Sequence, residues 1–328
     1  MPLLLLNEDE LRQVVTISEA IDAVEAAFAA LAEGRLHLPG EFALNLPEVK
    51  GEIRVKGTYL DKTPYYVVKV RSNFRQNPMR NLSSHSGLTA VVDAVTGIPA
   101  AIMLDNGYLS TIRSGAAGAV AAKYLANEQI DQVAVIGSGN QAYIQLKALM
   151  KTRNIGTVTA WASSPANADY FARRLVEDHD LDIQITSSVE TAVRSADLIV
   201  TATRSERPLI EADWLKVGVH LTVIGGKRPT QQLLHLDVLR RADVIITDQY
   251  SQAAVTGEIY HGLEAGVISK EDVQGELGDL IIGKIPGRTH PDQISLADLT
   301  GLDVQDTALA TLALEKARFL GLGQQVEN

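Results

Sequence analysis

The chain contains 328 residues with a mass of 35.4 kDa, longer than one hydrophobic core usually supports, so we expect two packed domains. Its 46% hydrophobic content excludes long disordered segments, and its lack of cysteine excludes disulfides, zinc–thiolate sites, iron–sulfur clusters and thiol nucleophiles. A formal net charge of −10 disfavours nucleic acid and anionic membranes as partners, since both require a basic surface.

The first residues give no sign of a targeting segment. The opening MPLLLLNEDE is too short and too quickly acidic for a signal peptide, and no apolar run approaches the roughly 20 residues that a bilayer crossing needs. We therefore expect a cytoplasmic protein.

Two helices are predicted near the N-terminus. Asn7 with Glu10, and Thr16 with Glu19, have the spacing of a capping box, in which a side-chain oxygen and a carboxylate satisfy the first free backbone amides of a helix. After the second box, apolar residues recur at helical spacing over residues 18–34, where a glycine supplies the stop.

A strand-rich segment follows. Residues 53–59, 66–70 and 88–93 are rich in β-branched and aromatic side chains, are separated by turn-forming clusters, and predict strands. From Lys50 to Arg80 the chain carries eight basic and two acidic residues, although the whole protein is acidic. Such a patch favours a small anionic ligand, and the alternative is a solvated surface.

After residue 106 the pattern changes. Residues 110–125 predict a helix rich in Ala and Gly, a composition that allows close approach to another backbone. Residues 307–320 predict a last helix that returns to the first domain. Between them lie short apolar strands, mostly separated by helical stretches, as in a parallel sheet that is buried on both faces. Their ranges are 133–136, 158–161, 183–185, 198–201, 221–224 and 244–247.

A glycine-rich motif follows the first of these strands. Residues 137–142 read Gly-Ser-Gly-Asn-Gln-Ala and match G-x-G-x-x-A between that strand and a helix over 141–150. Gly137 permits a tight turn, Gly139 lets a pyrophosphate reach the backbone at the helix N-terminus, and Ala142 lets helix and strand pack closely. The alternative is a purely structural glycine turn. The residues of this loop assigned to cofactor binding are Gly137, Gly139, Asn140, Gln141 and Ala142.

The end of the second strand bears on the choice of cofactor. NAD-preferring sites usually place an acidic residue there to hold the ribose hydroxyls, and this chain has Ser163 and Ser164 instead. Because no carboxylate would repel a 2′-phosphate, NADP(H) is slightly favoured over NAD(H). The alternative is that Ser164, before Pro165, only caps the next helix.

Two longer segments, together with the glycine loop, carry a family resemblance. Asp105–Ala119 contains the words Asp-Asn-Gly-Tyr-Leu and Arg-Ser-Gly-Ala, and Asp298–Ala308 contains Asp-Leu-Thr-Gly and Val-Gln-Asp-Thr-Ala. Over nearly its whole length the chain resembles the ornithine cyclodeaminase/μ-crystallin family, and these words look most like the ectoine-utilisation and iminosuccinate reductase branch.

The resemblance implies an α/β fold and a homodimer. Residues 1–112 and 303–328 would form a strand-rich α+β domain for substrate binding and dimerisation, which the C-terminal helix completes. Residues 113–302 would form a Rossmann dinucleotide-binding domain.

The resemblance also implies roles for individual residues. Arg113, in the Arg-[Ser/Thr]-x-Ala word, matches the family's ligand for the substrate carboxylate, and Lys69 matches a strand lysine that points into the same pocket. A guanidinium suits a carboxylate because its planar fork donates two parallel hydrogen bonds. The remaining cofactor contacts are assigned to Ser84, Ser114, Ser163, Ser164, Thr203 and Gly301.

Two departures from the family pattern bear on the substrate. Ornithine cyclodeaminases carry an Asp in a Gly-[Gly/Ser]-Asp-x-Pro word, where this chain has Lys227, and a Glu thirteen residues before the strand lysine, where it has Lys56. Cations at both positions disfavour the distal ammonium of ornithine and favour a second carboxylate, as in iminosuccinate. Strand alternation puts Arg54 on the same face as Lys56, and Arg71 on the same face as Lys69.

These features define the candidate substrate contacts. His85 is a candidate proton carrier, although such a histidine is more often packed or at the surface. The alternative for Lys56 and Arg71 is that they are only solvent-exposed charges at a sheet edge. The candidates are Arg54, Lys56, Arg71, His85 and Lys227.

Together the assignments predict an NAD(P)H-dependent imine reductase or amino-acid dehydrogenase for a small imino or 2-oxo acid, which in one alternative is dicarboxylic. Arg113 would clamp the α-carboxylate, and Lys69 would orient the substrate or relay a proton. The other hypotheses are a cyclodeaminase-type lyase with bound NAD and a non-catalytic cofactor-binding protein. No metal site is expected, and Asp303 and Asp306 are assigned to capping the last helix.

Overall fold

The computed structural model describes residues 2–37, 39–178, 182–203, 205–225 and 230–327. The chain divides into two compact units, of which unit 1 comprises residues 1–113 and 302–328 and unit 2 comprises residues 114–301. Within the described ranges, no helix has both the length and the apolar character needed to cross a membrane. Lys227 lies outside the described residues.

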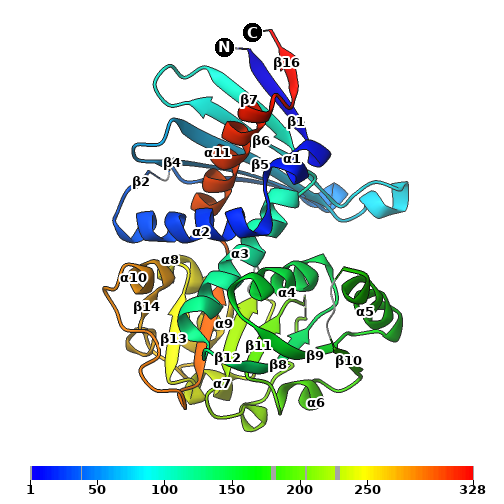
Figure 1. The fold of residues 1–328 in the computed structure, drawn as a ribbon, viewed down its shortest axis with the longest axis vertical. Helices are drawn as coiled ribbons and strands as arrows, with labels where there is room; N and C mark the ends of the chain where they lie inside the picture. The colour runs from blue at the N-terminus through cyan, green and yellow to red at the C-terminus, as the bar shows by residue number, and fades with distance from the viewer. Residues whose placement is uncertain (1, 38, 179–181, 204, 226–229, 328) are drawn as a thin grey trace. The chain divides into compact units, whose positions relative to one another are not determined.

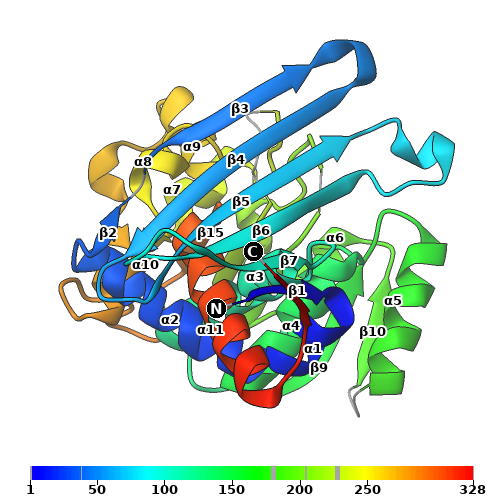
Figure 2. The same cartoon turned by 90° about the horizontal axis from the view of Figure 1, so that it is seen from above.

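Unit 1 is built around a mixed sheet with the strand order β16-β1-β7-β6-β5-β4-β2, to which β3 adds by pairing with β4. Figure 2 shows β3, β4, β5 and β6 as long strands lying side by side. The strands are β1 (Leu3–Asn7), β2 (Leu36–His37), β3 (Glu41–Leu46), β4 (Gly51–Leu60), β5 (Tyr65–Phe74), β6 (His85–Asp93), β7 (Pro99–Leu104) and β16 (Gln324–Val326).

Helices cover one face of this sheet. Helix α11 (Asp303–Leu320) contacts β4, β5 and β6 on this face, and α2 (Ile17–Ala32) packs against α11 (Figure 1). Both predicted capping boxes are confirmed, since Asn7 and Thr16 accept from the third backbone amide of α1 (Glu8–Val14) and of α2. We call the face that α11 covers the inner face and the opposite one the outer face.

Unit 2 is a parallel sheet with the strand order β10-β9-β8-β11-β12-β15-β13-β14, flanked by helices (Figure 1). The chain runs outward from β8 in both directions, as in a doubly wound nucleotide-binding fold. The strands are β8 (Ile130–Ile136), β9 (Ile155–Trp161), β10 (Ile183–Thr186), β11 (Leu198–Thr201), β12 (His220–Ile224), β13 (Val244–Thr247), β14 (Gly275–Glu276) and β15 (Ser295–Leu299).

The helices of unit 2 bury the apolar strands from both faces, as the sequence predicts. On one face α6 and α7 pack with Ile199 and Leu221 of the core. The helices that follow α3 (Tyr108–Leu125), which the unit boundary divides, are α4 (Asn140–Thr152), α5 (Pro165–Asp178), α6 (Val189–Val193), α7 (Leu236–Arg241), α8 (Tyr250–Ala253), α9 (Glu258–Glu264) and α10 (Leu277–Ile281).

The small residues of α3 allow the close helix approach expected from its composition. A Cβ at Gly115 would lie 2.5 Å from Ile144 Cγ2 and 3.0 Å from the Ile144 carbonyl oxygen on α4. A Cβ at Gly118 would lie 2.0 Å from Gln145 Oε1. The fold is therefore α/β, with a Rossmann unit and a strand-rich α+β unit that the C-terminal helix completes.

Candidate functional site

Four cations of unit 1 lie together on the inner face of the sheet. In the β4–β5 register Arg54 is opposite Arg71, and Lys56 is opposite Lys69. Directly opposed residues of an antiparallel pair project to the same face, and so do residues two apart on one strand. Sheet register thus gathers the cations that the sequence spreads over eighteen positions.

Lys69 and Arg113 converge on one carboxylate of α11. Lys69 Nζ lies 2.8 Å from Asp306 Oδ1 and also donates to Ser110 Oγ, and Arg113 Nε lies 3.4 Å from the same Asp306 oxygen. Arg113 Nη1 donates to Gln305 Oε1 at 2.7 Å. Side-chain exposure is only 16% for Lys69, 10% for Arg113 and 9% for Asp306, so these ion pairs are shielded from bulk water.

The assignment of Asp303 and Asp306 to helix capping is wrong. The residue that precedes α11 is Leu302, which makes no side-chain capping bond, and both aspartates lie inside the first turn of the helix. Their spacing of three residues puts them on one helix face, toward the sheet. Asp303 Oδ1 lies 3.3 Å from Lys56 Nζ, while Asp306 forms ion pairs with Lys69 and Arg113.

Local charges and burial shift two pKa values in this cluster. Burial raises the pKa of Asp303, and Asp306 raises it further, whereas Lys56 and Arg113 oppose the shift. Desolvation lowers the pKa of Arg71, and the positive charge of Arg113 lowers it further. Arg71 is exposed at the surface, and the positive charge of Arg113 acts on its guanidinium.

The other predicted contacts of unit 1 lie further along the sheet. His85 begins β6 and pairs with Asn73, four residue pairs beyond the Lys69–Thr89 pair, and shares the inner face with Lys69. Ser84 lies just before β6, where its carbonyl accepts from Phe74 N at 2.8 Å. Register does not bring either residue to the Lys69–Asp306 pair, and their assigned roles stay predictions.

The glycine loop of unit 2 has the geometry of a phosphate-binding turn. Gly137 adopts φ +134, and a Cβ there would lie 2.4 Å from the Ala202 carbonyl oxygen, so the turn requires glycine. A Cβ at Gly139 would meet no atom within 4 Å, which leaves open space beside the N-terminus of α4. That space and the free amides of the helix suit an anionic pyrophosphate.

Neighbouring residues also fit a dinucleotide. Thr203 follows β11 and lies beside both Gly137 and Gly225, so it reaches the switch point between β8 and β11 where such folds bind nucleotides. Gln141 Nε2 is buried and has no hydrogen-bond partner among the described residues, which leaves a donor for a bound group. Ala142 is fully buried, in accord with close packing of α4 on the sheet.

The segment after β9 combines a cap with an exposed hydroxyl. Ser164 Oγ accepts from Asn167 N at 3.4 Å, so it serves as the N-terminal cap of α5, as the structural alternative predicted. Ser163 is exposed. Arg174 of α5 donates to Asn140 Oδ1 at 3.1 Å and stacks 3.6 Å over the Tyr143 ring, which places a cation beside the glycine loop.

Three buried carboxylates of unit 2 accept hydrogen bonds from backbone amides. Asp298 Oδ2 accepts from the amides of Glu258 and Ile259, and Glu258 accepts from those of Leu233 and Leu234. Burial raises the pKa of Asp298 to about 7 and that of Glu258 to about 8, and the Asp298 charge adds to the second shift.

The third buried carboxylate, Asp248, fixes the residues that end unit 2. It accepts from Thr300 Oγ1 at 2.8 Å and from Gly301 N at 2.5 Å, and burial raises its pKa. Gly301 adopts φ +89, a conformation that favours glycine. Ser114, on α3, is buried, and its carbonyl accepts from Gln145 Nε2 at 2.6 Å. The assigned cofactor contacts of Gly301 and Ser114 stay predictions.

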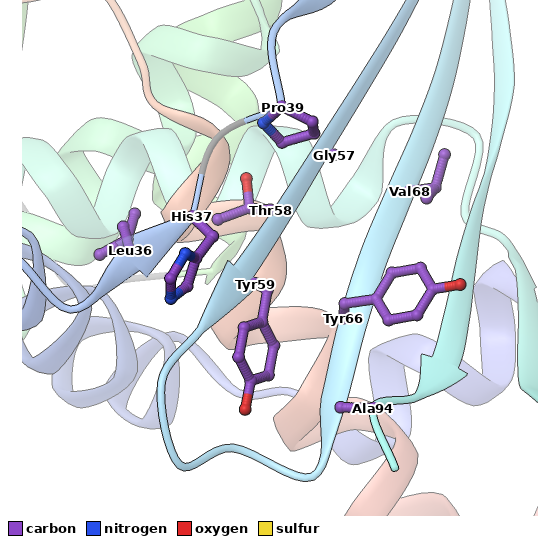
Figure 3. Close-up of a pocket in the computed structure, with 9 residues that line it drawn as sticks. All are labelled: Leu36, His37, Pro39, Gly57, Thr58, Tyr59, Tyr66, Val68 and Ala94. Carbon is purple, nitrogen blue, oxygen red and sulfur yellow. The ribbon is translucent and has the colours of Figure 1, made fainter. Parts of the chain in front are cut away.

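A hollow of about 680 Å³ lies on the outer face of the unit 1 sheet. Figure 3 shows His37, Tyr59 and Tyr66 around it, with Val68 on the neighbouring strand. Tyr59 and Tyr66 are directly opposed across β4 and β5. Each lies three residues from the lysine of its own strand, Lys56 or Lys69, and therefore projects to the opposite face of the sheet. The hollow is therefore separated from the cationic cluster by the sheet.

Comparisons with known proteins agree with this geometry. A model of the ornithine cyclodeaminase/mu-crystallin family matches residues 3–319. The structure of Δ1-pyrroline-2-carboxylate reductase from Thermococcus litoralis, in complex with NADH and L-proline, superposes with a TM-score of 0.92 at 29% identity, covering 99% of this chain and 100% of that one.

Two further solved structures cover the whole length. An archaeal alanine dehydrogenase dimer with bound NAD has a TM-score of 0.93 at 34% identity and covers 100% of this chain and 99% of that one. The iminosuccinate reductase of Paracoccus denitrificans with NAD+ has a TM-score of 0.92 at 27% identity, with 100% of both chains covered. The family match over nearly all residues, together with the fold, shows that this chain belongs to the ornithine cyclodeaminase/mu-crystallin family.

Proposed function

We propose that this protein is an NAD(P)H-dependent imine reductase or amino-acid dehydrogenase that acts on a small imino or 2-oxo acid. The observation that carries the proposal is the convergence of Lys69 and Arg113 on Asp306, in a chain that also has a nucleotide-type glycine loop. Relatives that resemble the chain over its full length act on pyrroline-2-carboxylate and iminosuccinate, and another is an alanine dehydrogenase, which supports this reaction class.

Arg113 is the proposed ligand for the substrate α-carboxylate. A guanidinium carries five N–H donors in a fixed plane. Gln305 accepts a hydrogen bond from Nη1, and the Asp306 carboxylate forms an ion pair with the guanidinium, 3.4 Å from Nε. These contacts orient the plane, and the remaining donors can bind a carboxylate. A fixed guanidinium holds the substrate with little loss of side-chain entropy on binding.

Lys69 is the proposed proton donor to the substrate nitrogen. Its ammonium has three N–H groups, of which Ser110 Oγ and Asp306 Oδ1 each accept one. The third N–H is unused by the residues that the structure describes and can serve the substrate. A bound reduced nicotinamide supplies the hydride to the imine carbon and is oxidised, while the C=N electron pair moves to nitrogen, which takes the proton.

The cofactor would bind at Gly137–Ala142, which includes Gln141, with Thr203 beside the loop. Because no carboxylate directly follows β9, where Ser163 and Ser164 stand instead, we propose that NADPH is accepted and bound at least as well as NADH. The cytoplasmic location stays a prediction.

The reaction is tested by following oxidation of NADPH and of NADH with a panel of imines. The panel holds a cyclic ketimine, pyruvate with methylamine, and oxaloacetate with ammonium. Turnover is expected with at least one of them, with a KM for NADPH no higher than that for NADH. Release of proline and ammonia from ornithine without net nicotinamide oxidation would instead indicate a lyase, and tight NADPH binding without any turnover would indicate a binding protein.

We also propose that the protein is a homodimer that pairs through the outer face of the unit 1 sheet. That face exposes large apolar side chains, with Phe42 60%, Leu44 42% and Leu104 42% exposed. Large apolar side chains exposed on one face of a sheet favour association, and a two-fold axis would bury this face against itself.

Light scattering on the purified protein is expected to give the mass of two chains. Replacing Phe42 with aspartate puts a charge on the apolar face, and we expect it to shift the mass toward one chain. A wild-type mass of one chain across micromolar concentrations would refute the dimer.

A further inference from the structure

We infer that Arg71 binds a second carboxylate of the substrate, so that the protein prefers short 2-imino or 2-oxo dicarboxylic acids to monocarboxylic ones. This inference rests on the proposed function and assigns the substrate class of the same site. It starts from the way in which the cations of the inner face are paired.

Three of the four cations on the sheet have a carboxylate partner within the chain. Lys69 pairs with Asp306 at 2.8 Å, and Lys56 pairs with Asp303 at 3.3 Å. Arg54 Nε donates to the Glu52 carboxylate. In each case the partner already occupies part of the cation's hydrogen-bonding capacity.

Arg71 differs from these three. Among the described residues no carboxylate lies within ion-pair distance of its guanidinium, and Glu52 and Asp306 act on it only at longer range. Arg113, the proposed α-carboxylate ligand, is close enough to repel it electrostatically. Two guanidiniums held near each other form a place where an anion is favourable, because an anion relieves their repulsion and satisfies their donors.

The spacing of the cations suits a short dicarboxylate. Arg71 and Lys69 are two residues apart on β5 and share a face, so their Cα atoms are about 7 Å apart along the strand. An acid whose α-carboxylate and nitrogen lie at Arg113 and Lys69 would present a carboxylate about two or three bonds further on to the flexible Arg71 side chain. Arg71 is solvent-exposed, so its substitution should leave the core intact.

The test compares oxaloacetate with pyruvate, each with ammonium and NADPH, on the full-length protein. We expect kcat/KM for oxaloacetate to exceed that for pyruvate by at least about tenfold. Arg71→Met should raise the KM for oxaloacetate about 10- to 100-fold, which is the range for loss of a charge-assisted pair, and should change kcat/KM for pyruvate by less than about threefold. Arg71→Lys should restore part of the loss.

The matched control is Arg75→Met, which removes an exposed arginine just after β5. It should leave kcat/KM for both oxaloacetate and pyruvate unchanged. A readout independent of turnover is the rise in melting temperature of the NADP+-loaded protein with succinate, propionate or phosphate. Of the three anions, only succinate should clearly raise the melting temperature, and Arg71→Met should abolish that rise.

The possible failures are distinguishable. Equal use of both oxo acids, an equal loss for both in Arg71→Met, or equal stabilisation by phosphate and succinate would overturn the assignment of Arg71 and leave imine reduction standing. Absence of turnover with oxaloacetate, pyruvate and cyclic ketimines alike would overturn the proposed function itself.

Discussion

Replacing Lys69 with methionine is expected to lower kcat for imine reduction by about 10²- to 10⁴-fold, the range for loss of a positioned general acid. Methionine keeps most of the apolar stem but carries no proton, and the Ser110 and Asp306 oxygens lose the ammonium that joins them. Steady-state kinetics with the best imine, together with titration of NADPH binding, checks this expectation. The dissociation constant for NADPH should stay within about threefold of wild type, because the glycine loop belongs to unit 2.

Two further variants separate proton transfer from charge. Lys69→Arg keeps a cation beside Asp306 but does not release its proton in the working range, so we expect KM to be restored more fully than kcat. The matched control is Lys151→Met, at an exposed position near the end of α4, which should leave kcat within about twofold of wild type. Should Lys69→Met retain more than about a tenth of wild-type kcat, the proton comes from another group.

The fold of unit 2 was largely predictable, because buried parallel strands appear in sequence as short apolar runs. All six predicted strands form. The strand β15 was missed because its sequence, Ser-Leu-Ala-Asp-Leu, places an aspartate in the middle of a fully buried strand. The amides of Glu258 and Ile259 satisfy that carboxylate. These amides lie about forty positions away in the chain, so no local pattern could reveal them.

The candidate site was predictable in its cations and not in its anions. Lys69 and Arg113 were singled out through the family resemblance, and strand alternation placed Arg71 on the same face as Lys69. Asp306 was assigned to a helix cap, because an aspartate at the start of a helix is most often stabilised by the free amides and the helix dipole. Only the packing of α11 against β4 and β5 brings it to Lys69, and this is a long-range consequence of the tertiary structure.

The two glycines of the nucleotide motif are expected to respond differently to the same added methyl group. Gly137→Ala should lower the free energy of unfolding by about 2 to 6 kcal/mol, since φ +134 strains an L-residue and the Cβ would overlap the Ala202 carbonyl oxygen. Gly139→Ala should change it by less than about 1 kcal/mol, because Gly139 has φ −82 and ψ 178, which any residue adopts, and its Cβ meets no atom within 4 Å.

The affinity for NADPH provides a second test of the Gly139→Ala variant. The open space beside Gly139 is where we propose that the pyrophosphate approaches the α4 amides, so a methyl group there should raise the dissociation constant for NADPH by at least about tenfold in a protein that melts like wild type. Urea unfolding and calorimetric titration of both variants give the two quantities. Unchanged NADPH affinity in Gly139→Ala would mean that the dinucleotide does not lie against this loop. Wild-type stability in Gly137→Ala would mean that the backbone of the turn can shift, because only such a shift removes the clash between the new Cβ and the Ala202 carbonyl oxygen.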